Sequence, residues 1–286
     1  MSLRSWIQAS RPLAQANLAG PVLLGQALAF DRTGRFGWPW LVALFAWTVL
    51  DQLVIVWGND YADRDDDVGG SAKTPFSGGS GVIQEGKIRP AALKRAALAA
   101  YALLLALGVV LSVLRSFWVL PLTLAAGLLL WAYSFPPVRL SYRGGGEHLQ
   151  ALGVGVVLPL LGFAVQAGEL ASFPWPALLA TYLFGFAGNV ATALPDVGVD
   201  RRAKKRTWPV RFGPNSSRWY CLALTVAGLG AVSAFGHPLA AALGTLPVIA
   251  TFRLGRGRAA IVRFILLQGA AAQFGILGWA AFLVWL

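Results

Sequence analysis

The chain has 286 residues, of which 57% are hydrophobic and only 13% are charged, and its formal net charge is +12. Soluble domains contain about 45–50% apolar and about 25% charged residues, so this composition excludes an ordinary soluble globular protein. The apolar residues lie in long runs, which predicts a membrane protein; the positive charge then reflects membrane topology and an anionic small substrate rather than a nucleic acid partner.

Nine hydrophobic runs are predicted to cross the lipid bilayer, which gives an all-α polytopic membrane protein with nine transmembrane helices. We expect one bundle around a central apolar cavity, in a single transmembrane domain over residues 1-286. No removable signal peptide is expected, because no small-residue cleavage site follows a short apolar core near the N-terminus. The first and eighth runs are short for a bilayer of about 30 Å and are expected to extend into their polar flanks. The nine runs are Leu18–Phe30, Trp40–Trp57, Ala91–Leu114, Phe117–Tyr133, Leu149–Ala167, Trp175–Leu194, Trp219–Phe235, Leu239–Phe252 and Phe264–Leu286.

Basic residues are distributed unevenly between the two sides that nine spans define. Of the 24 Lys and Arg residues, 21 belong to the N-terminus and to the loops after the second, fourth, sixth and eighth spans. The positive-inside rule places that side in the cytoplasm. We therefore predict a multi-pass protein of the cell (inner) membrane, with its active site facing the cytoplasm, because both acidic motifs described next belong to this side.

Five aspartates lie within eight positions directly after the second run: Asp60, Asp63, Asp65, Asp66 and Asp67. On a continued helix, Asp60, Asp63 and Asp67 share one face because they are spaced i, i+3, i+7. Asp65 and Asp66 then point away from that face and are expected to be solvated. An acidic, solvated loop is the alternative interpretation, whereas a calcium-binding EF-hand loop fits worse because its Gly and terminal Glu are missing.

Three other features of the first half of the chain bear on the site, and the first two of them have two interpretations each. Asp51 lies inside the second run, where a carboxylate is functional by default, although it could instead hydrogen-bond a neighbouring helix. The Gly-rich loop Val68–Pro90 is either a lid over a site or a flexible connection. In Tyr133–Glu147, paired prolines end the fourth run and a triple glycine permits a close backbone approach.

A second acidic motif ends the sixth run, with Asp196 and Asp200 at i, i+4. Two facing carboxylate clusters repel each other unless a hard divalent cation with oxygen ligands lies between them. The basic run Arg201–Arg206 follows, and Arg64 lies inside the first motif; such cations suit phosphate oxygens. Arg201 and Arg202 could equally be topology determinants that bind anionic lipid.

Together these residues predict a diphosphate site at an Asp-rich mouth of an apolar bundle. A molecule with a diphosphate head and a hydrocarbon tail fits such a site, and metal and cations would stabilise the leaving diphosphate. Aromatic rings near the mouth could stabilise an allylic cation through their π faces. These rings belong to Trp57, Tyr61, Trp131, Tyr133 and Phe135.

Asn59-Asp60-x-x-Asp63-Arg64-x-x-Asp67 resembles the first Asp-rich motif of the UbiA-type intramembrane prenyltransferases, and Asp196-x-x-x-Asp200 with Lys205-Arg206-Thr207 resembles their second. The resemblance covers nearly the whole chain. It implies nine transmembrane helices, a Mg2+ cofactor, and transfer of a prenyl group from a prenyl diphosphate to an aromatic or other lipophilic acceptor. The carboxylates predicted to act in catalysis and to bind metal are Asp60, Asp63, Asp67, Asp196 and Asp200. The residues predicted to bind substrate are Asn59, Arg64, Tyr133, Arg139, Arg143, Lys205 and Arg206.

Within the family, several segments resemble the branch that prenylates 1,4-dihydroxy-2-naphthoate in menaquinone biosynthesis. This resemblance implies an aromatic acceptor held near Tyr133–Glu147, and Arg143 could pair with its carboxylate because a guanidinium matches a carboxylate bidentately. A terpene cyclase using the same site without an acceptor, and a transporter of an anionic solute, remain alternatives. The segments are Arg11-Pro12, Pro21–Gly25, Tyr142–Glu147, Lys205-Arg206-Thr207 and Val210–Gly213.

Overall fold

The computed structural model describes residues 2–66, 79–252, 254 and 257–285, and every regular element among them is a helix. The first half contains α1 (Leu3–Ser10), η1 (Pro12–Gln15), α2 (Ala16–Thr33), α3 (Trp38–Ala62), α4 (Pro90–Leu114), α5 (Val119–Ser134), α6 (Leu140–Arg143), α7 (Gly146–Leu152), η2 (Gly153–Val157) and α8 (Leu158–Ala167). The second half contains α9 (Ala177–Ala193), η3 (Leu194–Asp196), α10 (Val197–Arg202), α11 (Trp208–Phe212), α12 (Pro214–Phe235), α13 (Pro238–Thr251) and α14 (Arg258–Trp285).

Seven helical segments among the described residues are long and apolar enough to cross a membrane. The predicted fourth and eighth runs correspond to the shorter apolar helices α5 and α13, of 16 and 14 residues. The expected extension of the first run is present, because α1, η1 and α2 together form the segment Leu3–Thr33. The seven segments are Leu3–Thr33, Trp38–Ala62, Pro90–Leu114, Gly146–Ala167, Ala177–Arg202, Pro214–Phe235 and Arg258–Trp285.

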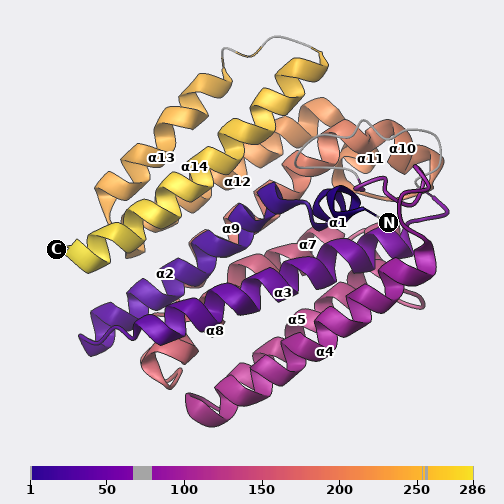
Figure 1. Cartoon of the computed structure of the whole chain (residues 1–286). Coiled ribbons are helices and arrows are strands. Elements are labelled where there is room, and N and C mark those ends of the chain that lie inside the picture. Colours follow the sequence, from indigo (N-terminus) through magenta and orange to yellow (C-terminus); the bar gives the residue numbers. More distant parts are fainter. Residues whose placement is uncertain (1, 67–78, 253, 255–256, 286) are drawn as a thin grey trace.

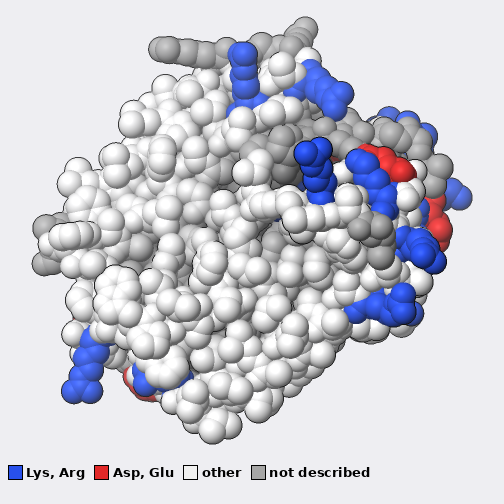
Figure 2. Space-filling view, in the orientation of Figure 1, with Lys and Arg blue, Asp and Glu red and all other residues white. Residues whose placement is uncertain are grey.

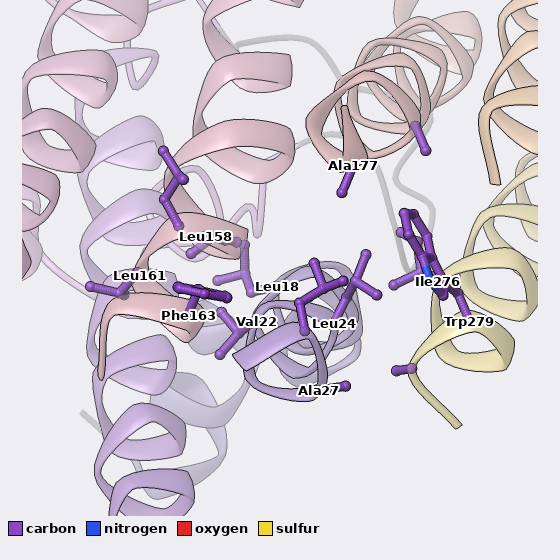
Figure 3. Close-up of a cluster of buried hydrophobic side chains, with 14 of the residues drawn as sticks. Leu18, Val22, Leu24, Ala27, Leu158, Leu161, Phe163, Ala177, Ile276 and Trp279 are labelled. Carbon is purple, nitrogen blue, oxygen red and sulfur yellow. The ribbon is translucent and has the colours of Figure 1, made fainter. Parts of the chain in front are cut away.

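Helix α2 lies in the centre of the bundle, packed against α8 on one side and α14 on the other. The contact between α2 and α8 depends on glycine: a Cβ on Gly25 would lie 2.1 Å from the Pro159 carbonyl oxygen, and one on Gly162 would lie 2.3 Å from the Val22 carbonyl oxygen. The two backbones therefore approach closely where small residues meet, as is common between helices in membranes. Figure 3 shows the apolar side chains of α2 between those of α8 and α14.

The charged residues mark the two ends of the bundle. In Figure 2, uncharged side chains cover the middle of the visible face, and Lys and Arg gather mainly at the end where α1, α10 and α11 lie in Figure 1. Helices α3 and α5 both run towards this end, since the Oγ of Ser134 donates to the Oδ1 of Asn59 over 3.1 Å near their C-termini. The end of the bundle that carries the acidic motifs is thus also the basic end.

Candidate active site

A cavity of about 290 Å³ opens between the helices beneath this end of the bundle. Its wall has a polar part and an apolar part. The polar part near the helix ends includes Arg11, Asn59, Asp63, Asp196, Asp200, Lys205 and Thr207. The apolar part includes Leu18, Ile55, Val56, Ala126, Leu129, Leu130, Val154, Val157 and Leu158, from α2, α3, α5, η2 and α8.

Asp63 is the most heavily bonded carboxylate of the polar part. Helix α3 ends at Ala62, and Asp63 caps it by donating its backbone N–H to the Asn59 carbonyl over 2.9 Å. Its Oδ2 accepts a hydrogen bond of 2.8 Å from the Nζ of Lys205, and its Oδ1 accepts one of 2.9 Å from the Oη of Tyr142. Only 4% of Asp63 is exposed, so the buried negative charge is balanced by an ammonium group more than 140 positions away in the chain.

The expectation that Asp66 is solvated is met only in part, because one third of its side chain (33%) is exposed and its carboxylate is also bonded to the protein. Because the helix stops before Asp63, the chain turns, and the Oδ2 of Asp66 accepts hydrogen bonds from Tyr142 over 2.6 Å and from Arg139 over 2.9 Å. The bond from Tyr142 holds the pKa of the Asp66 carboxyl below its ordinary value. The Arg139 guanidinium also lies 3.6 Å from the Oδ1 of Asp63 and stacks on the Tyr142 ring. Tyr142 and Arg139 therefore join the first acidic motif to the loop after α5.

Asp60 has a different environment from the one predicted. It is buried, but it does not line the cavity; its carboxylate accepts from the backbone N–H of Ser80 over 3.2 Å and from the Ser80 hydroxyl. The Nε2 of Gln8 donates to the Ser80 carbonyl over 2.8 Å, so α1 holds the same segment from the other side. Asp60 is therefore an attachment point for the segment that follows the first motif.

The second motif lines the same cavity. The 3-10 turn η3 continues α9 into α10 and carries Asp196 and Asp200 to the cavity. Asp200 is buried and accepts a 3.0 Å hydrogen bond from Thr207, and its carbonyl accepts one of 2.8 Å from the Lys205 backbone N–H. Burial opposes the charge of Lys205, but Asp63 and Asp200 outweigh it, so the pKa of Lys205 is raised. Lys205 is a cation at all physiological pH values.

Not every predicted substrate-binding residue lies at the cavity. Asn59, Tyr133 and Lys205 line it. Arg64 instead donates to the Tyr61 carbonyl over 2.7 Å and pairs with Asp65, away from the cavity wall. The remaining three do not line it either: Arg143 and Arg206 are exposed, and Arg139 pairs with Asp63 and Asp66. The predicted ligand Asp67 lies outside the described residues.

The described residues include no group of three or more His, Cys, Asp or Glu side chains close enough together to hold a metal ion. The chemistry of the donors nevertheless fits a hard divalent cation, because Asn59, Asp63, Asp196 and Asp200 all present oxygen atoms to the same cavity. In the present geometry, Lys205 supplies the positive charge that Asp63 requires.

The model of the UbiA prenyltransferase family matches residues 18–260, which covers both acidic motifs and most of the bundle. The chain belongs to the UbiA prenyltransferase family. With its seven long apolar helical segments, it is a multi-pass membrane protein.

The chain is similar to curated proteins with different names. The chain is 30% identical over 243 residues to a lycopene elongase/hydratase of Haloferax volcanii, covering 84% of this chain and 75% of the relative. It is 31% identical over 255 residues to a 4-hydroxybenzoate octaprenyltransferase of Burkholderia vietnamiensis, covering 83% and 80%. It is 27% identical over 278 residues to a C(50) β-cyclic carotenoids biosynthesis protein of a Dietzia species. That match covers 96% of this chain but only 60% of the relative's length.

Solved structures of UbiA homologues share the fold. One from Archaeoglobus fulgidus, bound to GPP and Mg2+, superposes with a TM-score of 0.68 at 17% identity, over 96% of this chain and 98% of the other. The apo structure of a homologue from Aeropyrum pernix K1 gives a TM-score of 0.70 at 18% identity, over 95% and 98%. The helical bundle of this chain is therefore the UbiA fold.

Several residues of the site escaped the sequence analysis. Among the described residues, the Lys and Arg side chains that line the cavity are Lys205, which the sequence predicts, and Arg11, which it does not. Arg11 stands beside Pro12 at the entrance of α2 with a left-handed backbone (φ 46°), a break that turns the chain between α1 and η1. Tyr142 belongs to the segment Tyr142–Glu147 that carries the family resemblance, but the sequence assigns no role to its side chain. Tertiary contacts bring Arg11 and Tyr142 to the site, and no local sequence pattern predicts those contacts.

Proposed function

We propose that this UbiA-family enzyme transfers a prenyl group from a prenyl diphosphate to a lipophilic acceptor in a Mg2+-dependent reaction. The observation that carries the proposal is the division of one cavity into a polar part with Asp63, Asp196, Asp200 and Lys205 and a part lined by apolar side chains, which suits a hydrocarbon chain. A diphosphate head belongs in the first part and an isoprenoid tail in the second.

Magnesium would be held by the oxygen donors of Asn59, Asp63, Asp196 and Asp200, and the proposal includes Asp67 as a further ligand. When bound, Mg2+ neutralises the diphosphate and makes it a better leaving group. The homologue from Archaeoglobus fulgidus that is bound to GPP and Mg2+ supports the choice of Mg2+.

Side chains of the protein itself bind the diphosphate, stabilise the allylic cation and exclude water. Lys205 and Arg11 bind diphosphate oxygens, and Lys205 exchanges Asp63 for phosphate when substrate enters. The carbon–oxygen bond of the prenyl diphosphate then breaks, and its electron pair leaves with the diphosphate. The π face of Tyr133, which lines the cavity, stabilises the allylic cation. The apolar wall excludes water until π electrons of the acceptor form the new carbon–carbon bond and the acceptor loses a proton.

The chemical identity of the acceptor is a separate and more specific part of the proposal. The segment resemblance favours 1,4-dihydroxy-2-naphthoate and menaquinone biosynthesis, and a 4-hydroxybenzoate octaprenyltransferase among the relatives also favours an aromatic acid. Carotenoid-modifying relatives favour a polyene instead. Arg143, the cation intended for the naphthoate carboxylate, is exposed away from the cavity, which weighs against that specific pairing.

Incubation of the purified protein with geranylgeranyl diphosphate, Mg2+ and a panel of aromatic acids and polyenes tests the proposal. We expect diphosphate release that requires Mg2+ and an acceptor, with the prenylated product identified by mass. Release without acceptor, together with a cyclised product, would replace the transferase by a cyclase. Release in no condition, with uptake of an anionic solute into proteoliposomes, would replace the enzyme by a transporter.

A further inference from the structure

Two polar side chains lie deep in the apolar part of the cavity, where the proposed reaction does not use them. Asp51 and Gln52 are neighbours on α3, each is 5% exposed, and both line the cavity. At 1.5 Å per residue, Asp51 lies about 12 Å along the helix from Asn59 and about 18 Å from Asp63. The pair is therefore distinct from the polar part of the cavity that would hold the diphosphate.

Neither side chain is explained by a hydrogen bond within the protein. The Nε2 of Gln52 is buried and has no hydrogen-bond partner among the described residues, and Asp51 makes no hydrogen bond or ion pair with any of them. The nearest polar side chain of α3 is Thr48, which already donates to the Phe45 carbonyl and accepts from the Nε2 of Gln15. An unpaired buried amide is costly, about 1–3 kcal/mol, so its persistence inside a cavity points to a ligand.

The facing wall supplies no partner either. Two hydrogen bonds fix the register of α3 against α5, from the Nε1 of Trp47 to the Oγ1 of Thr123 and from the Oγ of Ser134 to the Oδ1 of Asn59. This register places Asp51 opposite the part of α5 that contributes the apolar side chains of Ala126, Leu129 and Leu130 to the cavity.

The third wall contains an irregular helix turn. The π-helical turn η2 lines the cavity with Val154 and Val157, and the Thr181 hydroxyl satisfies the Gly155 carbonyl. Such turns are frequent at functional sites because they bulge the helix and reshape its surface. The α5 and η2 walls at this depth are therefore apolar, whereas α2, whose start is joined to Thr48 by Gln15, contributes Leu18 and the polar Asn17 to the cavity.

We infer that Asp51 and Gln52 form a binding subsite for a hydroxyl group of the lipophilic acceptor. A hydroxyl is the smallest group that satisfies both side chains, because it donates one hydrogen bond to the Asp51 carboxyl and accepts another from the Gln52 amide. The inference rests on the proposed function only in naming the ligand as the acceptor. It predicts that the enzyme prefers a phenol or an alcohol to a hydrocarbon of the same shape.

Binding of 1-naphthol and 1-methylnaphthalene, which differ in little but the hydroxyl group, tests the subsite without requiring turnover. Each competes against radiolabelled 1-naphthol on the full chain in lipid nanodiscs, with empty nanodiscs subtracted. We expect 1-naphthol to compete at a concentration on the order of tenfold lower than 1-methylnaphthalene. Equal competition by the two compounds, as a resident water between Asp51 and Gln52 would produce, overturns the inference.

Variants then assign the preference to these residues. Asp51→Leu and Gln52→Leu should abolish it and leave the affinity for 1-methylnaphthalene equal or higher. Ile55→Ala is the matched control, because Ile55 lines the same cavity one turn away and should weaken both compounds alike. A preference that survives both Leu variants places the hydroxyl elsewhere and overturns the assignment.

Diphosphate release separates this inference from the proposed function. If the wild-type protein releases diphosphate with acceptor but binds the two probes equally, only the hydroxyl subsite fails. If it prefers 1-naphthol through Asp51 and Gln52 but never releases diphosphate, the subsite stands and the transferase fails. Gln52→Leu should fold normally, because it removes a buried donor that has no partner among the described residues.

Discussion

At the scale of single residues, Asp63 and Lys205 form a buried ion pair, with side chains 6% and 12% exposed. Asp63→Asn removes the carboxylate charge and leaves the ammonium of Lys205 poorly compensated, so we expect a loss of stability of about 3–5 kcal/mol as well as a loss of turnover by orders of magnitude. Lys205→Met added to Asp63→Asn should restore the thermal unfolding temperature but not diphosphate release. Recovery of turnover in the double variant would remove Asp63 from the chemistry.

Asp60 and Asp63 are adjacent members of one motif, yet the structure gives them different surroundings. Because Asp60 is bonded to Ser80 and does not line the cavity, we expect Asp60→Asn and Ser80→Ala to lower turnover without changing the Mg2+ concentration that gives half-maximal rate. Titration of Mg2+ against diphosphate release measures this directly. A strongly raised Mg2+ requirement for Asp60→Asn alone would restore Asp60 as a metal ligand.

The sequence predicted which residues are chemically important better than it predicted their partners. The spacing i, i+3, i+7 assumes that α3 continues through Asp67, but the helix ends at Ala62, and beyond that point the helical periodicity no longer says where a side chain points. Asp66 therefore turns towards Arg139 and Tyr142, and Asp60 meets a serine twenty positions later. Contacts across loops depend on where the chain returns, and composition and periodicity do not encode that.

At the scale of elements, the positions of the hydrophobic helices were predictable because long apolar runs have few alternatives in a membrane. The lengths of these helices were less predictable. The segment that contains the run beginning at Leu18 also includes α1 and η1, whereas α5 and α13 are too short to count among the seven long segments. The π-helical turn η2 and the 3-10 turn η3 had no recognisable signal. Both lie in the cavity wall, where packing against neighbouring helices outweighs local preference.

The close approach of α2 and α8 gives a prediction at this scale. Gly162→Ala places a methyl group 2.3 Å from the Val22 carbonyl oxygen, so the two backbones must separate, and we expect a lower unfolding temperature and lower yield. Gly230→Ala in α12 is the control, since nothing lies within 4 Å of its Cβ position and alanine favours a helix. Thermal unfolding in detergent compares them. Equal stability of the two variants would mean that the contact is not tight in the membrane.

At the scale of the whole molecule, aspartates of both acidic motifs line one cavity, and on the face that Figure 2 shows most Lys and Arg gather at that end of the bundle, which supports the predicted cytoplasmic orientation of the site. Cysteine accessibility measures that orientation. The single native cysteine, Cys221, is buried and should react little with a membrane-impermeant maleimide. Arg206→Cys, at the site end, should react in inverted vesicles but not in intact spheroplasts, whereas Arg35→Cys, in the loop between α2 and α3, should show the opposite pattern. Both positions are exposed, so a failure to react reports the side of the membrane rather than burial.

Labelling of Arg206→Cys from the outside would reverse the predicted orientation. It would also require the prenyl diphosphate, a polyanion that does not cross a lipid bilayer unaided, to reach the site from the opposite compartment.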